Sequence, residues 1–140
     1  MKKIMKSIFL ISLAILMCVT SFPIYATDTQ NDINPRLSHM DKASFSFSVD
    51  GSGGYAQADY IGYSASFVQA KITIKVQKRF LWVFWNDVGE WSATSTSLDD
   101  VFYHVFSLNG SGTYRAEFTL EVTGTDGTVD VVTDTLESSY

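Results

Sequence analysis

The sequence predicts an all-β domain, an antiparallel two-sheet sandwich of the immunoglobulin-like type with about seven strands. The first observation is strict alternation of apolar and polar residues over 68–77 and again over 113–122, which is the period of a half-buried strand. The second is the recurrence of glycine- and aspartate-rich turns every ~8–12 residues. The third is that no stretch of useful length after residue 42 shows the helical period. A closed β-barrel is the alternative architecture.

The first 26 residues predict a secretory signal peptide, which would form a helix. Three lysines lie within the first six residues, residues 7–20 are almost continuously apolar, and the small residue Ala26 precedes a polar stretch. We expect cleavage after Ala26, which makes the mature protein secreted and extracellular. An uncleaved membrane anchor is the rival interpretation, but the apolar core is shorter than the ~20 residues of a spanning helix.

Cleavage after Ala26 changes both the charge and the chemistry of the chain. It removes three lysines and no acidic residue, so the net charge falls from −5 to −8. It also removes Cys18, the only cysteine, so stability must come from a packed core rather than from disulfides. Residues 27–42 are polar and are predicted to form a flexible leader. Residues 43–140 are then the sandwich domain, which has the usual size of one domain.

Each predicted strand follows from its own pattern and is bounded by turn residues. In the fourth strand, Trp85, Val88 and Trp91 are spaced by three rather than by two, which predicts a bulge around Gly89. The fifth strand is apolar on both faces, which predicts burial from two sides. The predicted strands cover residues 43–49, 55–61, 66–77, 84–96, 101–108, 113–122 and 128–136.

Tyr114 opens the sixth strand directly after a glycine-rich turn. A tyrosine in this place resembles the tyrosine corner of immunoglobulin-like and fibronectin-type domains, although the cysteine pair of antibody domains is absent. The third and sixth strands of such a sandwich are usually neighbours. Lys71 and Lys75 are therefore expected to face Glu117 and Glu121 across the sheet.

Three short motifs carry a resemblance to a group of proteins: Trp85-x-x-Val88-x-x-Trp91, Gly112-Thr113-Tyr114-Arg115 and Glu137-Ser138-Ser139-Tyr140. On these motifs, residues 35–140 resemble a group of small secreted β-sandwich proteins of unknown function from Gram-positive bacteria. The resemblance implies a signal peptide followed by one all-β domain. It implies no catalytic residue, because none is known for the group.

The residues give little support to an enzyme, so neither a catalytic residue nor a cofactor is predicted. His39 lies in the predicted leader, and His104 lies inside a strand without a nucleophile motif nearby. Asp126, Asp130 and Asp134 recur every four residues, which puts them on one face of a strand and favours a solvated surface. A metal site is therefore not predicted, and calcium bound at a loop is the minor alternative.

Residues 78–85 form the most unusual segment, because a turn that should be polar is aromatic. Lys78 and Arg79 are followed by six large apolar residues, and alternation can bury only every second one. Exposed apolar groups that are rimmed by charge mark interaction sites. The candidate binding residues are Lys78, Arg79, Phe80, Leu81, Trp82, Phe84 and Trp85.

Three interpretations of this segment stay open. It folds back over an open end of the sandwich, it docks onto a protein or a cell-wall glycan, or it enters a membrane surface. We expect a secreted, non-enzymatic binding domain, with a membrane-active or bacteriocin-like factor as the alternative and a small secreted hydrolase third. The acidic net charge disfavours nucleic acid as a partner. The sequence predicts no oligomeric state.

Overall fold

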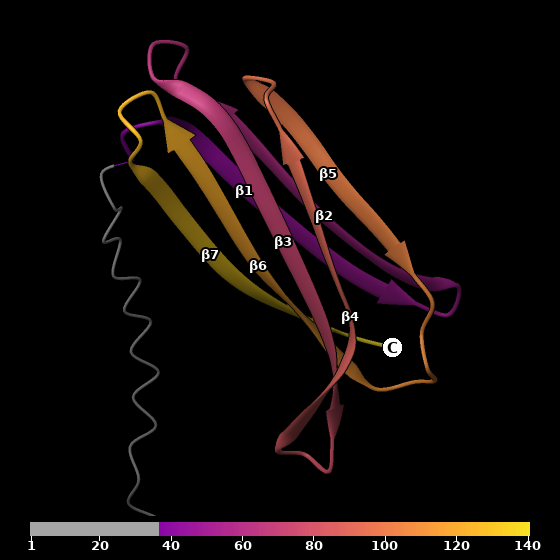
Figure 1. The fold of residues 1–140 in the computed structure, drawn as a ribbon. Helices are drawn as coiled ribbons and strands as arrows, with labels where there is room; N and C mark the ends of the chain where they lie inside the picture. The colour runs from indigo at the N-terminus through magenta and orange to yellow at the C-terminus, as the bar shows by residue number, and fades with distance from the viewer. Residues whose placement is uncertain (1–36) are drawn as a thin grey trace, which may run out of the picture. The chain divides into compact units, whose positions relative to one another are not determined.

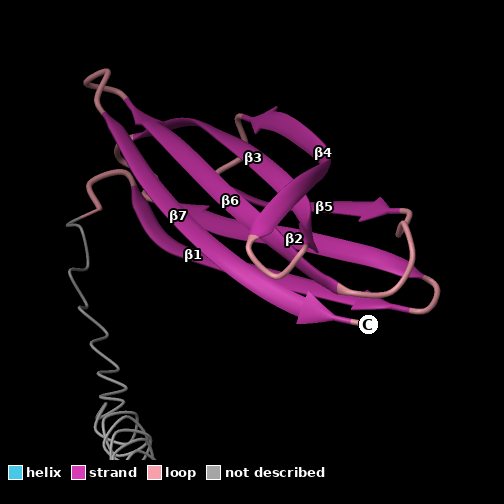
Figure 2. Cartoon of the chain, turned by 90° about the horizontal axis from the view of Figure 1, so that it is seen from below, coloured by secondary structure: helices cyan, strands magenta, loops and turns pink. Residues whose placement is uncertain are grey.

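The computed structural model describes residues 37–140, which form seven β-strands (Figure 1). The predicted signal peptide, its cleavage site and residues 27–36 of the predicted leader lie outside the described residues. Figure 2 shows only strands and loops in the described part, and no helix there is long and apolar enough to cross a membrane. The strands are β1 (Met40–Asp50), β2 (Gly53–Gly62), β3 (Phe67–Phe80), β4 (Phe84–Ser95), β5 (Asp99–Phe106), β6 (Thr113–Gly124) and β7 (Val129–Ser139).

The strands form two antiparallel sheets, which confirms the predicted fold class. One sheet has three strands in the order β1-β2-β5, and the other has four strands in the order β4-β3-β6-β7. The two sheets do not close into one cylinder, so the alternative of a closed barrel is wrong. In immunoglobulin constant-type domains the fourth strand joins the first sheet. Here β4 stays paired with β3, and this long hairpin carries the candidate site.

The core lies between the sheets and is filled largely by the inward-facing residues of β3 and β6. Ile72, Ile74 and Val76 on β3 are at most 3% exposed. Phe118 on β6 is 1% exposed, and its ring centre lies 5.0 Å from that of Phe45 on β1, across the space between the sheets. Each such side chain contributes ~1.5–3 kcal/mol when it is buried. The packed core therefore supplies stability without any help from cysteine.

The chain enters the sandwich earlier than the sequence predicts. β1 begins at Met40, which is fully buried, and His39 before it is 3% exposed. The backbone amide of His39 donates to Asp130 Oδ2 at 2.7 Å, and its ring nitrogen Nε2 lies 2.7 Å from Thr128 Oγ1. Residues 37–42 therefore belong to the sandwich, because the turn between β6 and β7 and the start of β7 hold them in place.

β5 is exposed on one face, so the prediction that it is buried from two sides is wrong. Its inward-facing Phe106 is 7% exposed, but Val101, Tyr103 and Val105 on the outer face are 52, 69 and 64% exposed. The physical reason is that β5 is an edge strand of the three-stranded sheet, whose outer face no other layer covers within residues 37–140. The continuous apolar run thus combines one face against the core with one apolar face in solvent.

Tyr114 forms the predicted tyrosine corner. Its side chain is fully buried at the start of β6, and its hydroxyl donates to the carbonyl oxygen of Gly110 at 2.6 Å. Gly110 has a φ of 75°, in the left-handed region that glycine adopts without a steric penalty. The hydrogen bond therefore fastens the loop between β5 and β6 to the start of β6.

The neighbouring positions of β3 and β6 are confirmed, with Lys71 opposite Glu121 and Lys75 opposite Glu117. Lys71 Nζ lies 3.4 Å from the Glu121 carboxylate, as expected. Lys75 Nζ instead lies 3.2 Å from Asp87 on β4. One of the two expected pairs is replaced because β4, on the other side of β3, offers a carboxylate of its own. Exposed pairs of this kind contribute ~0–1 kcal/mol each.

We predict that Tyr114→Phe lowers the free energy of unfolding by ~1 kcal/mol, because it removes the corner hydrogen bond while keeping the buried ring. Urea unfolding followed by tryptophan fluorescence measures the change. Tyr63→Phe is the matched control, since Tyr63 is 41% exposed, and it should change the free energy by less than ~0.5 kcal/mol. Equal effects of the two variants would contradict a structural role for the corner.

Candidate functional site

The β3–β4 hairpin ends in an exposed apolar tip. Phe80, the last residue of β3, pairs with Phe84, the first residue of β4, so three residues form the loop between them. We call Phe80–Phe84 the hairpin tip. Its side chains are 51, 64, 91, 72 and 61% exposed in chain order, with the maximum at Trp82. Figure 1 shows the turn extending past the ends of the neighbouring strands.

This exposure excludes one of the three interpretations of residues 78–85, namely that the segment folds back over an open end of the sandwich. A turn that folded back over an end of the sandwich would bury its aromatic side chains there. All five side chains of the tip are exposed instead, so that interpretation is wrong. The reason is the length of β3, whose last pair with β6 joins Lys78 to Tyr114. Beyond that pair the hairpin has only its own two strands.

The backbone of the tip adopts an unfavourable conformation. Leu81 and Trp82 have φ angles of 48° and 69°, in the left-handed region. That region costs a residue with a Cβ atom ~1–2 kcal/mol, and hairpin turns that need it commonly use Gly, Asn or Asp. Strain of this kind persists where the surrounding structure imposes it, and it clusters at functional sites.

A β-bulge bends β4 below the tip. It lies in the part of the hairpin that we call the root, which comprises residues 76–79 of β3 and residues 85–89 of β4. Val76 pairs with Gly89 and the next residue, Gln77, pairs with Asp87, so Val88 is an additional residue on β4. This confirms the bulge predicted around Gly89. A bulge bends its strand and increases the local twist. The end of the hairpin can therefore point in a different direction from the strands of the sheet.

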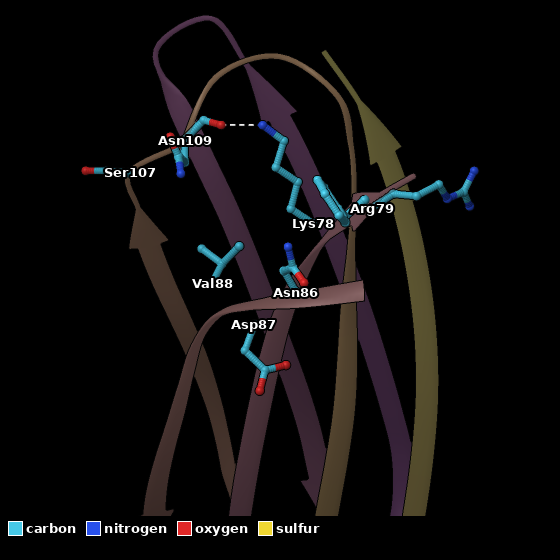
Figure 3. Close-up of a pocket in the computed structure, with 8 residues that line it drawn as sticks. Lys78, Arg79, Asn86, Asp87, Val88, Ser107 and Asn109 are labelled. Carbon is cyan, nitrogen blue, oxygen red and sulfur yellow. Dashed lines mark hydrogen bonds between the residues drawn. The ribbon is translucent and has the colours of Figure 1, made fainter. Parts of the chain in front are cut away.

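Lys78 is bound to a neighbouring loop. Its ammonium group donates to the carbonyl oxygen of Asn109 and lies 3.3 Å from that of Gly110. It also lies 5.4 Å from the centre of the Tyr114 ring, within the range of a cation–π contact. Figure 3 shows Lys78 pointing toward Asn109 and Arg79 pointing away from it. Lys78 therefore fastens the root of the hairpin to the loop between β5 and β6.

Arg79 and Trp85 pair across the two strands at the root. The Arg79 guanidinium donates to Glu137 Oε2 on β7 at 2.8 Å and lies 4.8 Å from the centre of the Trp85 ring. Arg115 of β6 lies 4.3 Å from the same ring centre. Each cation–π contact contributes ~0.5–1 kcal/mol at an exposed site. Trp85 thus supports the root, and the exposed large apolar residues at this end of the hairpin are those of the tip.

A chain of hydrogen bonds crosses the outer face of the four-stranded sheet below the tip. The amide nitrogen of Gln77 donates to Asp87 Oδ1 at 2.6 Å, and its amide oxygen accepts from Arg115 Nε at 2.8 Å. Arg115 also lies 2.8 Å from Glu117. The hydrogen bond from Gln77, followed by that from Lys75, holds the pKa of Asp87 below its usual value. The negative charge on Asp87 is thereby favoured, and it completes this network.

A cavity of about 440 Å³ lies beside the root (Figure 3). β3 and β4 line one side of it, and the segment after β5 lines the other through Ser107 and Asn109. Sequence reasoning missed these two residues, because Asn109 before Gly110 signals only a turn and its distance to the hairpin depends on the fold. The lining residues are Lys78, Arg79, Phe80, Asn86, Asp87, Val88, Ser107 and Asn109.

The residues considered for catalysis or for metal binding have other partners. The His104 ring stacks on Trp91, with ring centres 3.9 Å apart. Asp126 accepts from the backbone amide and the hydroxyl of Thr128, and Asp130 accepts from the amide of His39. Within residues 37–140, no group of three or more His, Cys, Asp or Glu side chains is arranged to hold a metal ion.

Comparison with known proteins adds no family to these observations. No protein-family model matches the chain, and no curated protein matches it. Its class is therefore defined by structure: an antiparallel two-sheet β-sandwich with a projecting aromatic hairpin. The resemblance to small secreted proteins of Gram-positive bacteria stays a prediction.

We predict that Leu81→Gly raises the free energy of unfolding by ~0.5–1 kcal/mol, because the relief of the Cβ clash at a left-handed φ, ~1–2 kcal/mol, exceeds the cost of the greater backbone freedom of glycine in the unfolded chain. Val83→Gly is the matched control, since Val83 is in the same loop and 72% exposed but has no positive φ. It should lose ~0.5–1 kcal/mol through the greater backbone freedom of the unfolded chain. Urea unfolding compares the two, and a loss of stability in both would exclude strain at Leu81.

Proposed function

We propose that the protein is a secreted, non-enzymatic binding domain that contacts its partner through the hairpin tip. The observation that carries this proposal is the exposure of Phe80–Phe84, whose side chains are 51 to 91% exposed at the end of a projecting hairpin. Leaving large apolar side chains in water forgoes ~1.5–3 kcal/mol each. A partner that covers the tip recovers this free energy on binding.

The root of the hairpin supports this role because it orders the tip before binding. Lys78 fastens one side of the root to the loop after β5, and Arg79 and Arg115 hold Trp85 on the other. A pre-ordered contact surface loses less conformational entropy on binding than a flexible loop does. Aromatic side chains that insert into a pocket of the partner often dominate the free energy of such contacts.

A protein or a cell-wall glycan fits the tip better than a membrane surface does. Attraction to a membrane would use Lys78 and Arg79 against anionic headgroups. Backbone carbonyl oxygens already accept from Lys78, and Glu137 already pairs with Arg79. The cavity beside the root also places the polar side chains of Asn86 and Asn109 near the tip, where they can form hydrogen bonds to the same partner.

One observation favours a membrane surface as the second candidate. The apolar surface of the tip includes all three loop residues at the end of the hairpin, Leu81, Trp82 and Val83, which are 64, 91 and 72% exposed. A bilayer interface can surround such a tip without a matching pocket, and tryptophan is enriched there. The unpaired backbone groups of the loop would limit entry to the interfacial zone, because they need hydrogen bonds.

We predict that Leu81→Ser/Trp82→Ser weakens binding to whole cells and isolated cell walls of a Gram-positive bacterium at least tenfold. Two exposed apolar contacts of ~1.5–3 kcal/mol each account for a change of this size. Co-sedimentation of purified protein measures the binding. The melting temperature should not fall, because both side chains are exposed. Val129→Ser/Val131→Ser on β7 is the matched control, with side chains 47 and 48% exposed, and it should bind as the wild type does.

Phosphatidylglycerol vesicles distinguish the second candidate in the same assay. Wild-type binding to vesicles but not to cell walls would replace the protein or glycan partner with a membrane surface. Binding to none of these probes, or equal binding by the tip variant, would contradict the proposed contact. A marked fall in the melting temperature of the tip variant would show instead that the tip supports the fold.

A further inference from the structure

β5 presents an apolar face beside a free sheet edge, in a separate place from the hairpin tip. Val101, Tyr103 and Val105 form a row that is 52, 69 and 64% exposed, and the Tyr103 ring stacks on Tyr55 of β2 with centres 6.4 Å apart. From Val101 to Phe106 the strand contains no charged residue, proline or glycine. Proteins usually protect edge strands with charged residues, proline or a β-bulge, because a free edge can pair with another chain.

The other three edge strands carry charged or polar side chains along the part that is apolar in β5, whose own two aspartates lie only at its start. The edge strands of the two sheets are β1 and β5 in one and β4 and β7 in the other. β4 and β7 carry acidic side chains, β4 also has the bulge, and β1 carries serines on its outer face. The residues concerned are Asp87 and Glu90 on β4, Asp130, Asp134 and Glu137 on β7, and Ser44, Ser46 and Ser48 on β1.

The backbone of β5 offers hydrogen-bonding groups on its free side. The amide of Val101 donates to Asp100 Oδ1 at 2.8 Å and therefore does not point into the ladder with β2. The backbone groups of every second residue in an antiparallel strand face the same neighbour. Those of Tyr103 and Val105 therefore face the same free side as those of Val101. Tyr103 and Val105 can each offer one donor and one acceptor to a further strand, whereas Val101 offers its carbonyl oxygen, because its amide already donates to Asp100.

The charges at the start of β5 select the direction of a second identical strand. Two aspartates, residues 99–100, open the strand, and its other end is uncharged. A parallel copy would place the two acidic pairs side by side, and like charges in that position destabilise a sheet. An antiparallel copy centred on Tyr103 places each acidic pair beside the uncharged end of the other strand.

We propose that β5 pairs antiparallel with the β5 of a second copy of this chain, with the two Tyr103 residues opposite each other. The pairing joins two three-stranded sheets into one continuous sheet. Val101 then lies opposite Val105 of the second copy, so the Tyr103 pair and both Val101–Val105 pairs join residues whose backbone groups face the free side, as hydrogen-bonded antiparallel pairs require. The same patch is used on both copies, as two-fold symmetry demands.

The remainder of the sandwich leaves this side of β5 open. In Figure 1, β5 is the outermost strand on its side of the view, as expected for an edge strand of its sheet. A cleft of about 400 Å³ lies between β4 and β5, with Trp91, Phe102 and His104 among its lining residues. In the proposed register, Phe102 of each copy lies opposite His104 of the other, beside this cleft. The pairing therefore covers apolar surface that a single copy leaves open.

The test is the mass of the purified protein in solution as a function of concentration, measured by sedimentation equilibrium. We expect the wild type to approach the mass of a dimer as concentration rises. Tyr103→Lys and Tyr103→Glu each place like charges opposite each other at the centre of the pairing, so each variant alone should dimerise at least tenfold more weakly. An equimolar mixture of the two should recover dimerisation, because lysine then faces glutamate.

Val131→Lys is the matched control, because Val131 is 48% exposed on the edge strand β7, and it should dimerise as the wild type does. Circular dichroism melting curves establish that the Tyr103 variants are folded. A wild type that stays monomeric at every concentration overturns the proposal, as do Tyr103→Lys and Tyr103→Glu dimers of wild-type strength or a mixture without recovery. Trp82→Ser should leave dimerisation unchanged, which separates this test from that of the tip.

Discussion

The pairing of β3 with β6 is the constraint on which the rest of the structure depends. It brings the two strands with the cleanest alternation together, and their inward side chains form most of the core. It also ends at a fixed place, where Lys78 pairs with Tyr114. β3 continues past this pair with β4 alone beside it. The candidate site therefore begins where the core ends, and its aromatic residues are exposed because the sandwich does not extend that far.

The tyrosine corner couples this boundary to the candidate site. The hydroxyl of Tyr114 donates to the carbonyl oxygen of Gly110, and the ammonium group of Lys78 lies 3.3 Å from the same oxygen. One carbonyl thus receives both the bond that closes the corner and a contact that holds the root of the hairpin. This explains how an exposed hairpin can keep a strained turn at Leu81 and Trp82, since such conformations persist only on a rigid support.

The fold could be predicted because it follows from local patterns. The exposure of the site residues and the partners of their charged groups could not. Alternation in β6 and the turn before Tyr114 are visible within a few residues, and the sandwich follows from them. Whether Phe80 is buried depends on where β6 begins beside β3, which no local pattern reveals. Lys78 and Arg79 resemble free charges in the sequence, but they bind groups 31 and 58 residues away. For the same reason the sequence wrongly predicts that β5 is buried from two sides, because its two apolar faces look alike in the sequence.

The two exposed apolar surfaces differ in geometry, and the difference separates their roles. The tip is a short strained loop with five consecutive exposed apolar residues, which suits insertion into a partner and offers little backbone for strand pairing. β5 is a regular strand with free backbone groups, and such an edge accepts any extended chain unless something occupies it. Pairing with its own copy closes the edge, and the acidic residues at 99–100 oppose the parallel stacking that builds fibrils. A dimer of this kind carries two tips, so even weak contacts reinforce each other when both tips bind one surface.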